Sequence, residues 1–152
     1  MNVPEWIAGC MEVERKMAQL YGLLADKFDT ERELFDTLRK EEMVHMQTLS
    51  LSETTDDYES KDLGREARLL LRTLDAADRV INKAQFSTMD LKEALDSALS
   101  LEEGVVENFV TSIPSVGGLM DTETLDRMSM ESTTHADMLR DALIRNGYMF
   151  QS

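Results

Sequence analysis

The apolar positions of this chain recur at steps of three and four residues, the spacing that places side chains along one face of an α-helix. One such stripe spans residues 5–28, and a second spans residues 31–51. The connection between the two stripes is very short. The two segments are therefore predicted to form an antiparallel helical hairpin.

A long connection follows this first hairpin. Residues 52–61 are polar and break the helical periodicity, which predicts a loop, whereas residues 63–84 carry another apolar stripe typical of a helix. The whole connection covers about residues 52–87. A connection of this length allows the helices on either side of it to run parallel, as in four-helix bundles with one crossover.

The second half of the chain predicts another helical hairpin. Residues 87–90 resemble a helix start, with a hydroxyl cap and an acid three residues later, and the helix should run to about Ser112. A stretch with proline and glycine, residues 114–118, is predicted to end it. The last helix should span residues 122–146, with Gly147 at the left-handed cap position.

Composition agrees with an all-α fold. The 152 residues include only seven glycines and two prolines, and 42% are apolar, which suits one globular domain over residues 1–152. The net charge of −14 argues against nucleic acid or an anionic membrane surface as the main partner. No apolar run approaches the ~18 residues of a membrane span. The lone Cys10 excludes an internal disulfide and a CxxC motif. A cytoplasmic location is expected.

Polar residues interrupt the apolar stripes near the middle of the four long helices. Glu42 precedes His45 by three residues, and the second histidine, His135, lies on the last helix. Glu14 and Glu102 lie on the stripes 31 and 33 residues before these histidines. The order of carboxylate and histidine thus occurs twice, with 88 residues between the two glutamates and 90 between the two histidines.

Carboxylates on a buried helix face are costly unless they are paired or bound to a cation. Carboxylate oxygens and imidazole nitrogens together suit a pair of divalent ions, iron or, as the alternative, manganese. The repeated order therefore predicts a site for two metal ions. For any single residue a simpler reading exists, because a glutamate can reach solvent from the edge of a stripe and a histidine can be a hydrogen-bonded core residue.

The segment Glu14–Tyr21 with the motif Glu42–His45 resembles the first half of the rubrerythrin-like branch of the ferritin-like di-iron carboxylate family. The segment Glu102–Phe109, followed by His135, is similar to its second half. The resemblance spans most of the chain and implies a ferritin-like antiparallel four-helix bundle with a long crossover between helices two and three. It further implies that Glu14 and Glu102 are terminal ligands, that Glu42 bridges two ions, and that each histidine binds one ion.

The second half departs from this family pattern. The resemblance places a second bridging glutamate three residues before His135, but Ser132 stands there and Glu131 lies one residue earlier. Either Glu131 faces inward, with a local π-bulge correcting the register, or it points to solvent and one bridge is missing. Tyr21 is either a core aromatic or a hydrogen-bond donor to a ligand carboxylate.

The expected function is oxidoreductase activity on O2, peroxide or Fe(II), of the peroxidase or ferroxidase type. A second interpretation is a degenerate bundle with weak or no metal binding that acts as a structural or interaction protein, and a third is iron handling or storage. The partners expected are metal ions and small oxidants, a second copy of the chain in a homodimer, and an external electron donor. A single cysteine cannot build the CxxC-type iron domain that supplies electrons in rubrerythrin.

Overall fold

The computed structural model describes residues 1–52 and 62–150. The described residues form five α-helices and one short 3-10 helix, η1, with no β-strand among them, which confirms the all-α prediction. The elements are α1 (Val3–Lys27), η1 (Asp29–Glu31), α2 (Arg32–Ser50), α3 (Gly64–Phe86), α4 (Leu91–Val116) and α5 (Thr122–Arg145).

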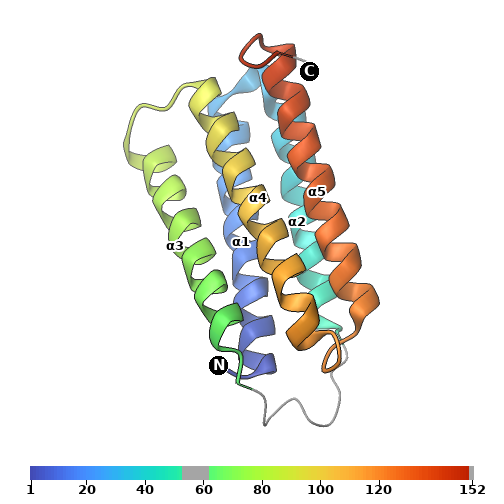
Figure 1. The fold of residues 1–152 in the computed structure, drawn as a ribbon. Coiled ribbons are helices and arrows are strands. Elements are labelled where there is room, and N and C mark those ends of the chain that lie inside the picture. The colour runs from blue at the N-terminus through green and yellow to red at the C-terminus, as the bar shows by residue number, and fades with distance from the viewer. Residues whose placement is uncertain (53–61, 151–152) are drawn as a thin grey trace.

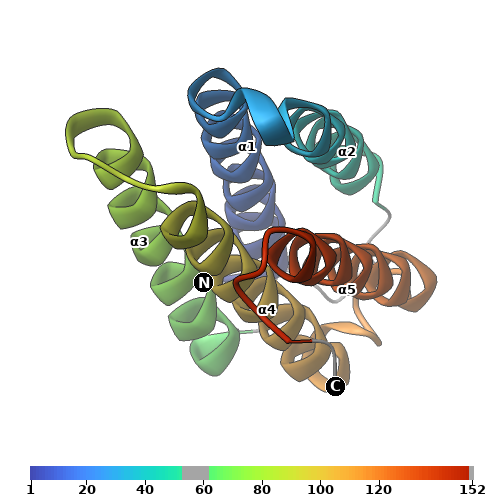
Figure 2. The same cartoon turned by 90° about the horizontal axis from the view of Figure 1, so that it is seen from above.

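Two helical hairpins pack against each other, and the remaining helix lies beside them. Helices α1 and α2 form one hairpin, and α4 and α5 form the other (Figure 1). Seen along the helices, α1, α2, α4 and α5 surround a common centre, whereas α3 lies outside it against α1 and α4 (Figure 2). The predicted helical stretch at residues 63–84 is α3. Of the polar loop predicted at 52–61, all but Ser52 lies outside the described residues.

Helix starts are fixed by short polar side chains. Asn2 caps α1 in a capping box, because its side chain accepts from the Glu5 backbone N–H while the Glu5 carboxylate accepts from the Asn2 N–H. The predicted start at residues 87–90 is correct in place but wrong in its cap. Asp90 is the cap of α4 and accepts from the Glu93 N–H at 2.8 Å, whereas the Ser87 hydroxyl donates to a carbonyl at the end of α3.

The predicted end of α4 is wrong, and the predicted end of α5 is confirmed. Helix α4 does not stop before Pro114 but continues through it to Val116. Proline removes one backbone donor in the last turn, and Val110, whose carbonyl loses that partner, is exposed to water. Gly147 has a φ of 76°, as predicted for a left-handed cap, and the Tyr148 N–H reaches back to the Leu143 carbonyl in a Schellman motif.

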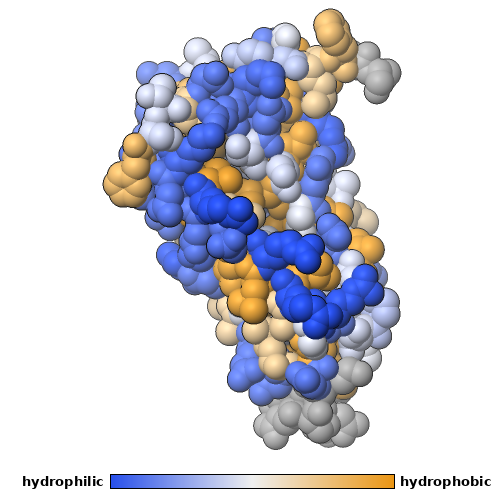
Figure 3. Space-filling view, turned by 60° about the vertical axis from the view of Figure 1, so that its left-hand side comes forward, coloured by the Kyte–Doolittle hydropathy of each residue, from blue (hydrophilic) through white to orange (hydrophobic). Residues whose placement is uncertain are grey.

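Apolar side chains fill the space between the helices. Trp6 and Phe109 meet edge to face with ring centroids 6.1 Å apart, and Tyr21 stacks on Phe35. Figure 3 shows the α3 side of the molecule, where hydrophilic side chains cover most of the surface and apolar ones lie between them. Within the described part of the chain, no helix combines the length and apolar character that crossing a bilayer requires.

The contact between α1 and α3 depends on the absence of a side chain at Gly9. A Cβ placed there would overlap a methyl carbon of Leu70, which is fully buried on α3. A Cβ placed on Gly104, inside α4, would have no neighbouring atom within 4 Å among the described residues outside that helix.

Gly9→Ala and Gly104→Ala should therefore shift stability in opposite directions. Gly104→Ala should raise the free energy of unfolding by about 1 kcal/mol through helix propensity. Gly9→Ala should lower the free energy of unfolding by about 1–3 kcal/mol, because the overlap with Leu70 costs more than the gain in helix propensity. Urea unfolding followed by circular dichroism measures both. Equal stabilisation by the two substitutions would show that α3 does not pack closely on α1.

Candidate metal centre

Four helices each direct polar side chains into the dry middle of the molecule. Glu14 comes from α1, Glu42 and His45 come from α2, Glu102 comes from α4, and His135 comes from α5. All five are at most 3% exposed. Each lies on the inward stripe of its helix, one or more turns away from either end, so packing of the apolar faces brings the five together.

The carboxylate of Glu42 lies between the two imidazoles. Its Oε2 is 3.4 Å from His45 Nδ1, and its Oε1 is 2.8 Å from His135 Nδ1. Glu14 Oε2 is also 3.5 Å from His45 Nδ1, and Glu102 Oε1 is 3.5 Å from His135 Nδ1. The rings are stacked with centroids 5.0 Å apart and planes 16° apart. The centre thus has two similar halves that share one carboxylate.

This buried group could hold a metal ion. Glu42, His45 and His135 each offer one ligand atom, and these atoms lie within 4.8 Å of one another. Two buried atoms at the centre, Glu14 Oε1 and His45 Nδ1, have no hydrogen-bond partner. Unpaired buried polar atoms are costly, and a cation would satisfy both of them. Mixed oxygen and imidazole donors suit iron, manganese or zinc.

Tyr21 supports one half of the centre. Its hydroxyl donates to Glu102 Oε1 at 2.6 Å, inside the core. Burial and the negative charge of Glu102 raise the pKa of Tyr21 well above its usual value, so the phenol keeps its proton and remains a donor. The equivalent position of the second half of the chain is Phe109, which packs on Trp6 and offers no hydrogen bond.

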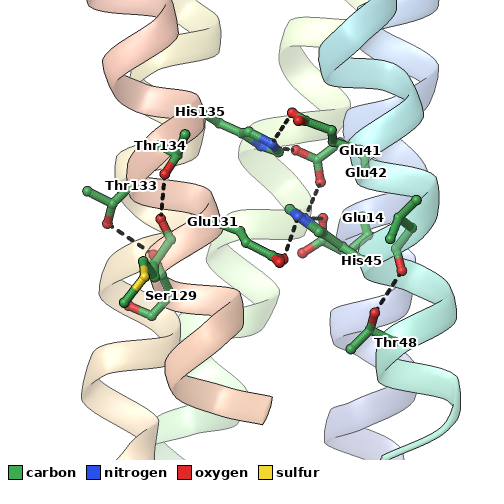
Figure 4. A network of polar contacts seen from close by, with 12 residues as sticks. Glu14, Glu41, Glu42, His45, Thr48, Ser129, Glu131, Thr133, Thr134 and His135 are labelled. Carbon is green, nitrogen blue, oxygen red and sulfur yellow. Dashed lines mark hydrogen bonds and ion pairs between the residues drawn. The ribbon is translucent and has the colours of Figure 1, made fainter. Parts of the chain in front are cut away.

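The outer nitrogens of the imidazoles bind two further glutamates across the gap between α2 and α5 (Figure 4). His45 Nε2 is 2.7 Å from Glu131 Oε2, and His135 Nε2 is 2.9 Å from Glu41 Oε2. These two side chains are 39% and 47% exposed. They line a pocket of about 270 Å³ together with the histidines, Val44 and Thr134.

The structure therefore places Glu131 at the outer edge of His45 and away from Glu42. Helix α5 is α-helical from Thr122 to Arg145, so the π-bulge considered for this segment is not formed. Ser132, at the position of the second bridging glutamate, is buried and carries no carboxylate. Position 132 therefore provides no second carboxylate between the two histidines.

Glu41 is a residue of the centre that reasoning from the sequence missed. The internal repeat contains the signal, because Glu41 and Glu131 each precede a histidine by four residues and are 90 residues apart. Glu131 is thus the counterpart of Glu41, and Ser132 is the counterpart of Glu42. Aligning the two halves on their histidines gives this correspondence directly.

Opposing effects set the charge of the imidazoles. Burial lowers the pKa of His45, but the carboxylates of Glu14 and Glu42 outweigh it and raise the pKa to about 10. Burial acts the same way on His135, and the carboxylates of Glu102 and Glu42 raise its pKa to about 11. Burial and the charge of Glu42 raise the pKa of Glu14 well above its usual range. Without a cation, both histidines are protonated at neutral pH.

No family model, curated protein or solved structure matches this chain. The interpretation of the centre therefore depends on its own geometry and charge.

Metal uptake should release protons, because a cation must displace the proton on the Nδ1 of each histidine. Since both pKa values lie above neutral, apparent affinity should rise by about tenfold per pH unit for each proton displaced, between about pH 6 and 9. Calorimetric titration of the metal-free protein with Zn(II), in buffers of different ionisation enthalpy, counts the protons. Binding without proton release would place the ion away from the histidines.

Proposed function

We propose that this protein binds two divalent metal ions, iron or alternatively manganese, and acts as an oxidoreductase on O2, peroxide or Fe(II). The observation that carries the proposal is the position of Glu42, a fully buried carboxylate with one oxygen toward each of two imidazoles. In the proposal, both ions would share this carboxylate. In the proposal, Glu14 and His45 complete one half-site, and Glu102 and His135 complete the other.

The buried negative charge supports binding of divalent cations. Three buried carboxylates carry up to three negative charges, and burying a charge without a partner costs several kcal/mol. Two divalent cations would compensate these charges once the imidazolium protons are released, with the half-exposed Glu41 and Glu131 beside the same rings. With one ion, the opposite half would keep the pairing of imidazolium and carboxylate that the metal-free protein has.

When bound, a pair of redox-active ions supplies the electrons for reduction of an oxidant. The chain's own residues shape the surroundings of the ions. The buried apolar core excludes bulk water from the inner side of the centre, and the Tyr21 hydroxyl fixes Glu102 Oε1. In the proposal, electrons for repeated turnover come from an external donor.

The order of the helices supports the ferritin-like topology as part of this proposal. One hairpin, α1 and α2, is followed by α3 in the long connection and then by a second hairpin, α4 and α5. Each hairpin contributes one glutamate and one histidine to the centre, and the first hairpin also contributes Glu42. The resemblance of the two carboxylate and histidine segments to the rubrerythrin-like branch points the same way.

A degenerate, metal-free bundle is the second candidate, and one observation favours it. Both imidazoles already have carboxylate neighbours on each ring nitrogen, so protonated histidines compensate part of the buried charge without a cation. In that case metal salts would not change the thermal stability of the protein. His45→Ala would then lower the stability, because it removes the positive partner of the buried Glu14 and Glu42 carboxylates.

Substitutions of the three carboxylates should change metal stoichiometry in different ways. The unmodified protein should bind two Co(II) per chain, measured by visible absorbance and elemental analysis. Glu14→Ala and Glu102→Ala should each reduce this to one, because each removes a ligand of one half-site. Glu42→Ala should abolish tight binding of both ions, because both half-sites share its carboxylate.

The matched control is Glu66→Ala, since Glu66 is a buried carboxylate on α3, which contributes no residue to the centre. This variant should keep two ions. Equal losses in Glu66→Ala and Glu42→Ala would attribute the effect to general destabilisation. Absence of Co(II) binding by the unmodified protein would favour the metal-free bundle.

Oxidation of bound Fe(II) tests the activity itself. Protein loaded with Fe(II) without oxygen and mixed with peroxide should form Fe(III) at about one peroxide per two Fe(II), since peroxide accepts two electrons. Stopped-flow absorbance follows the reaction, and Glu42→Ala gives the background. Oxidation no faster than that of Fe(II) in buffer, by a protein that holds two ions, would exclude the oxidoreductase function and leave iron handling.

A further inference from the structure

The two nitrogens of each imidazole face opposite environments. Both Nδ1 atoms face the buried carboxylates of the centre, whereas both Nε2 atoms face half-exposed glutamates at the pocket between α2 and α5. An imidazole that binds a metal through one nitrogen commonly donates its other N–H to a carboxylate, which fixes the ring and its tautomer.

The pairs are crossed between the helices. Glu41 and His45 are four residues apart on α2, the spacing at which side chains of one helix meet, and so are Glu131 and His135 on α5. Neither same-helix pair forms in the structure. Instead Glu41 binds His135, 94 residues away, and Glu131 binds His45, 86 residues away.

We propose that Glu41 and Glu131 are a crossed pair of positioning residues, each holding the histidine of the opposite helix with Nδ1 directed at the metal centre. The proposal rests on the metal-binding function proposed above. It assigns Glu131 to the outer edge of His45 and takes it out of the ligand set.

The different exposure of the glutamates supports this assignment. The carboxylates that face the Nδ1 atoms are at most 2% exposed, whereas Glu41 and Glu131 are 47% and 39% exposed. An ion held by Nδ1 of His45 and Glu42 would lie at a different ring edge from Glu131. With a carboxylate at Nε2, the ring carries its proton there and leaves the Nδ1 lone pair free for the ion.

The crossed arrangement also joins α2 to α5. Val44, which lines the pocket, is 57% exposed. Beside it, a charged hydrogen bond between His135 and Glu41 and an ion pair between His45 and Glu131 connect the two helices.

The experiment uses the fact that the chain has two histidines, so each can be followed separately. Protein labelled with ¹⁵N in histidine and loaded with Zn(II) should show metal-bound Nδ1 and protonated Nε2 on both rings in long-range ¹H–¹⁵N spectra. Glu131→Ala should shift the His45 ring signals and leave those of His135 in place. Glu41→Ala should do the reverse. Each substitution should weaken Zn(II) binding by about 10–100-fold.

Three further variants complete the design. Glu107→Ala removes an exposed glutamate of α4 and should change neither ring nor affinity. Glu131→Gln and Glu41→Gln keep an acceptor near Nε2 and should restore part of the lost affinity, which loss of fold would not allow. The unshifted histidine in each single variant reports that the centre remains folded.

Several outcomes would overturn the proposal. If Glu131→Ala shifts the ring signals of His135, which lies on the same helix, and leaves those of His45 in place, the pairs are not crossed. If Glu131→Ala loses one bound Zn(II) while the signal of the His45 Nε2 proton is unchanged, Glu131 is a direct ligand of the ion. If Glu41→Ala and Glu131→Ala match Glu107→Ala in ring signals and Zn(II) affinity, the two glutamates have no positioning role, although the metal site remains. Failure of the unmodified protein to bind Zn(II) would remove both proposals.

Discussion

The central constraint on this fold is the burial of three carboxylates in its dry middle. Glu14, Glu42 and Glu102 come from three helices and are almost completely inaccessible to water. Each would be strongly destabilising alone, because the solvation lost by a buried charge is regained only through a partner of opposite charge. The partners are two imidazoles in the metal-free state and, in the proposed function, two cations. The helices must therefore meet at their polar midpoints, and the apolar stripes on either side fix that register.

The two hairpins supply nearly equivalent halves, and their differences make the centre asymmetric. His45 and His135 match, as do Glu41 and Glu131, but Glu42 has Ser132 as its counterpart. The centre therefore has one carboxylate shared by the two histidines where a symmetric arrangement would have two. Tyr21 adds a second difference, since its hydroxyl stabilises the negative charge of Glu102, while Glu14 Oε1 has no donor. Two ions held here would therefore have carboxylate ligands of unequal basicity.

Much of the fold follows from the sequence, because helix periodicity and inward positions are local properties. The stripes predicted all five helices, and they placed Glu14, Glu42 and His45 inside. Side-chain partners between helices distant in the chain do not follow from spacing. Within one helix, Glu41 is expected to face His45, yet it binds a histidine 94 residues away. The course of α4 through Pro114 was missed for a related reason: proline is costly in a helix interior but tolerable where water can reach the freed carbonyl.

The seam between α2 and α5 connects the centre to its surroundings. On the other sides the centre is enclosed by the apolar contacts of the two hairpins, whereas at this seam both histidines line an open pocket. In the proposed function, a cation approaching from solvent through this pocket would meet the carboxylates of Glu41 and Glu131 before the imidazoles. The same two glutamates would attract the ion and orient the rings that bind it. Because their contacts cross between α2 and α5, loading of the centre would then be coupled to the packing of the two hairpins.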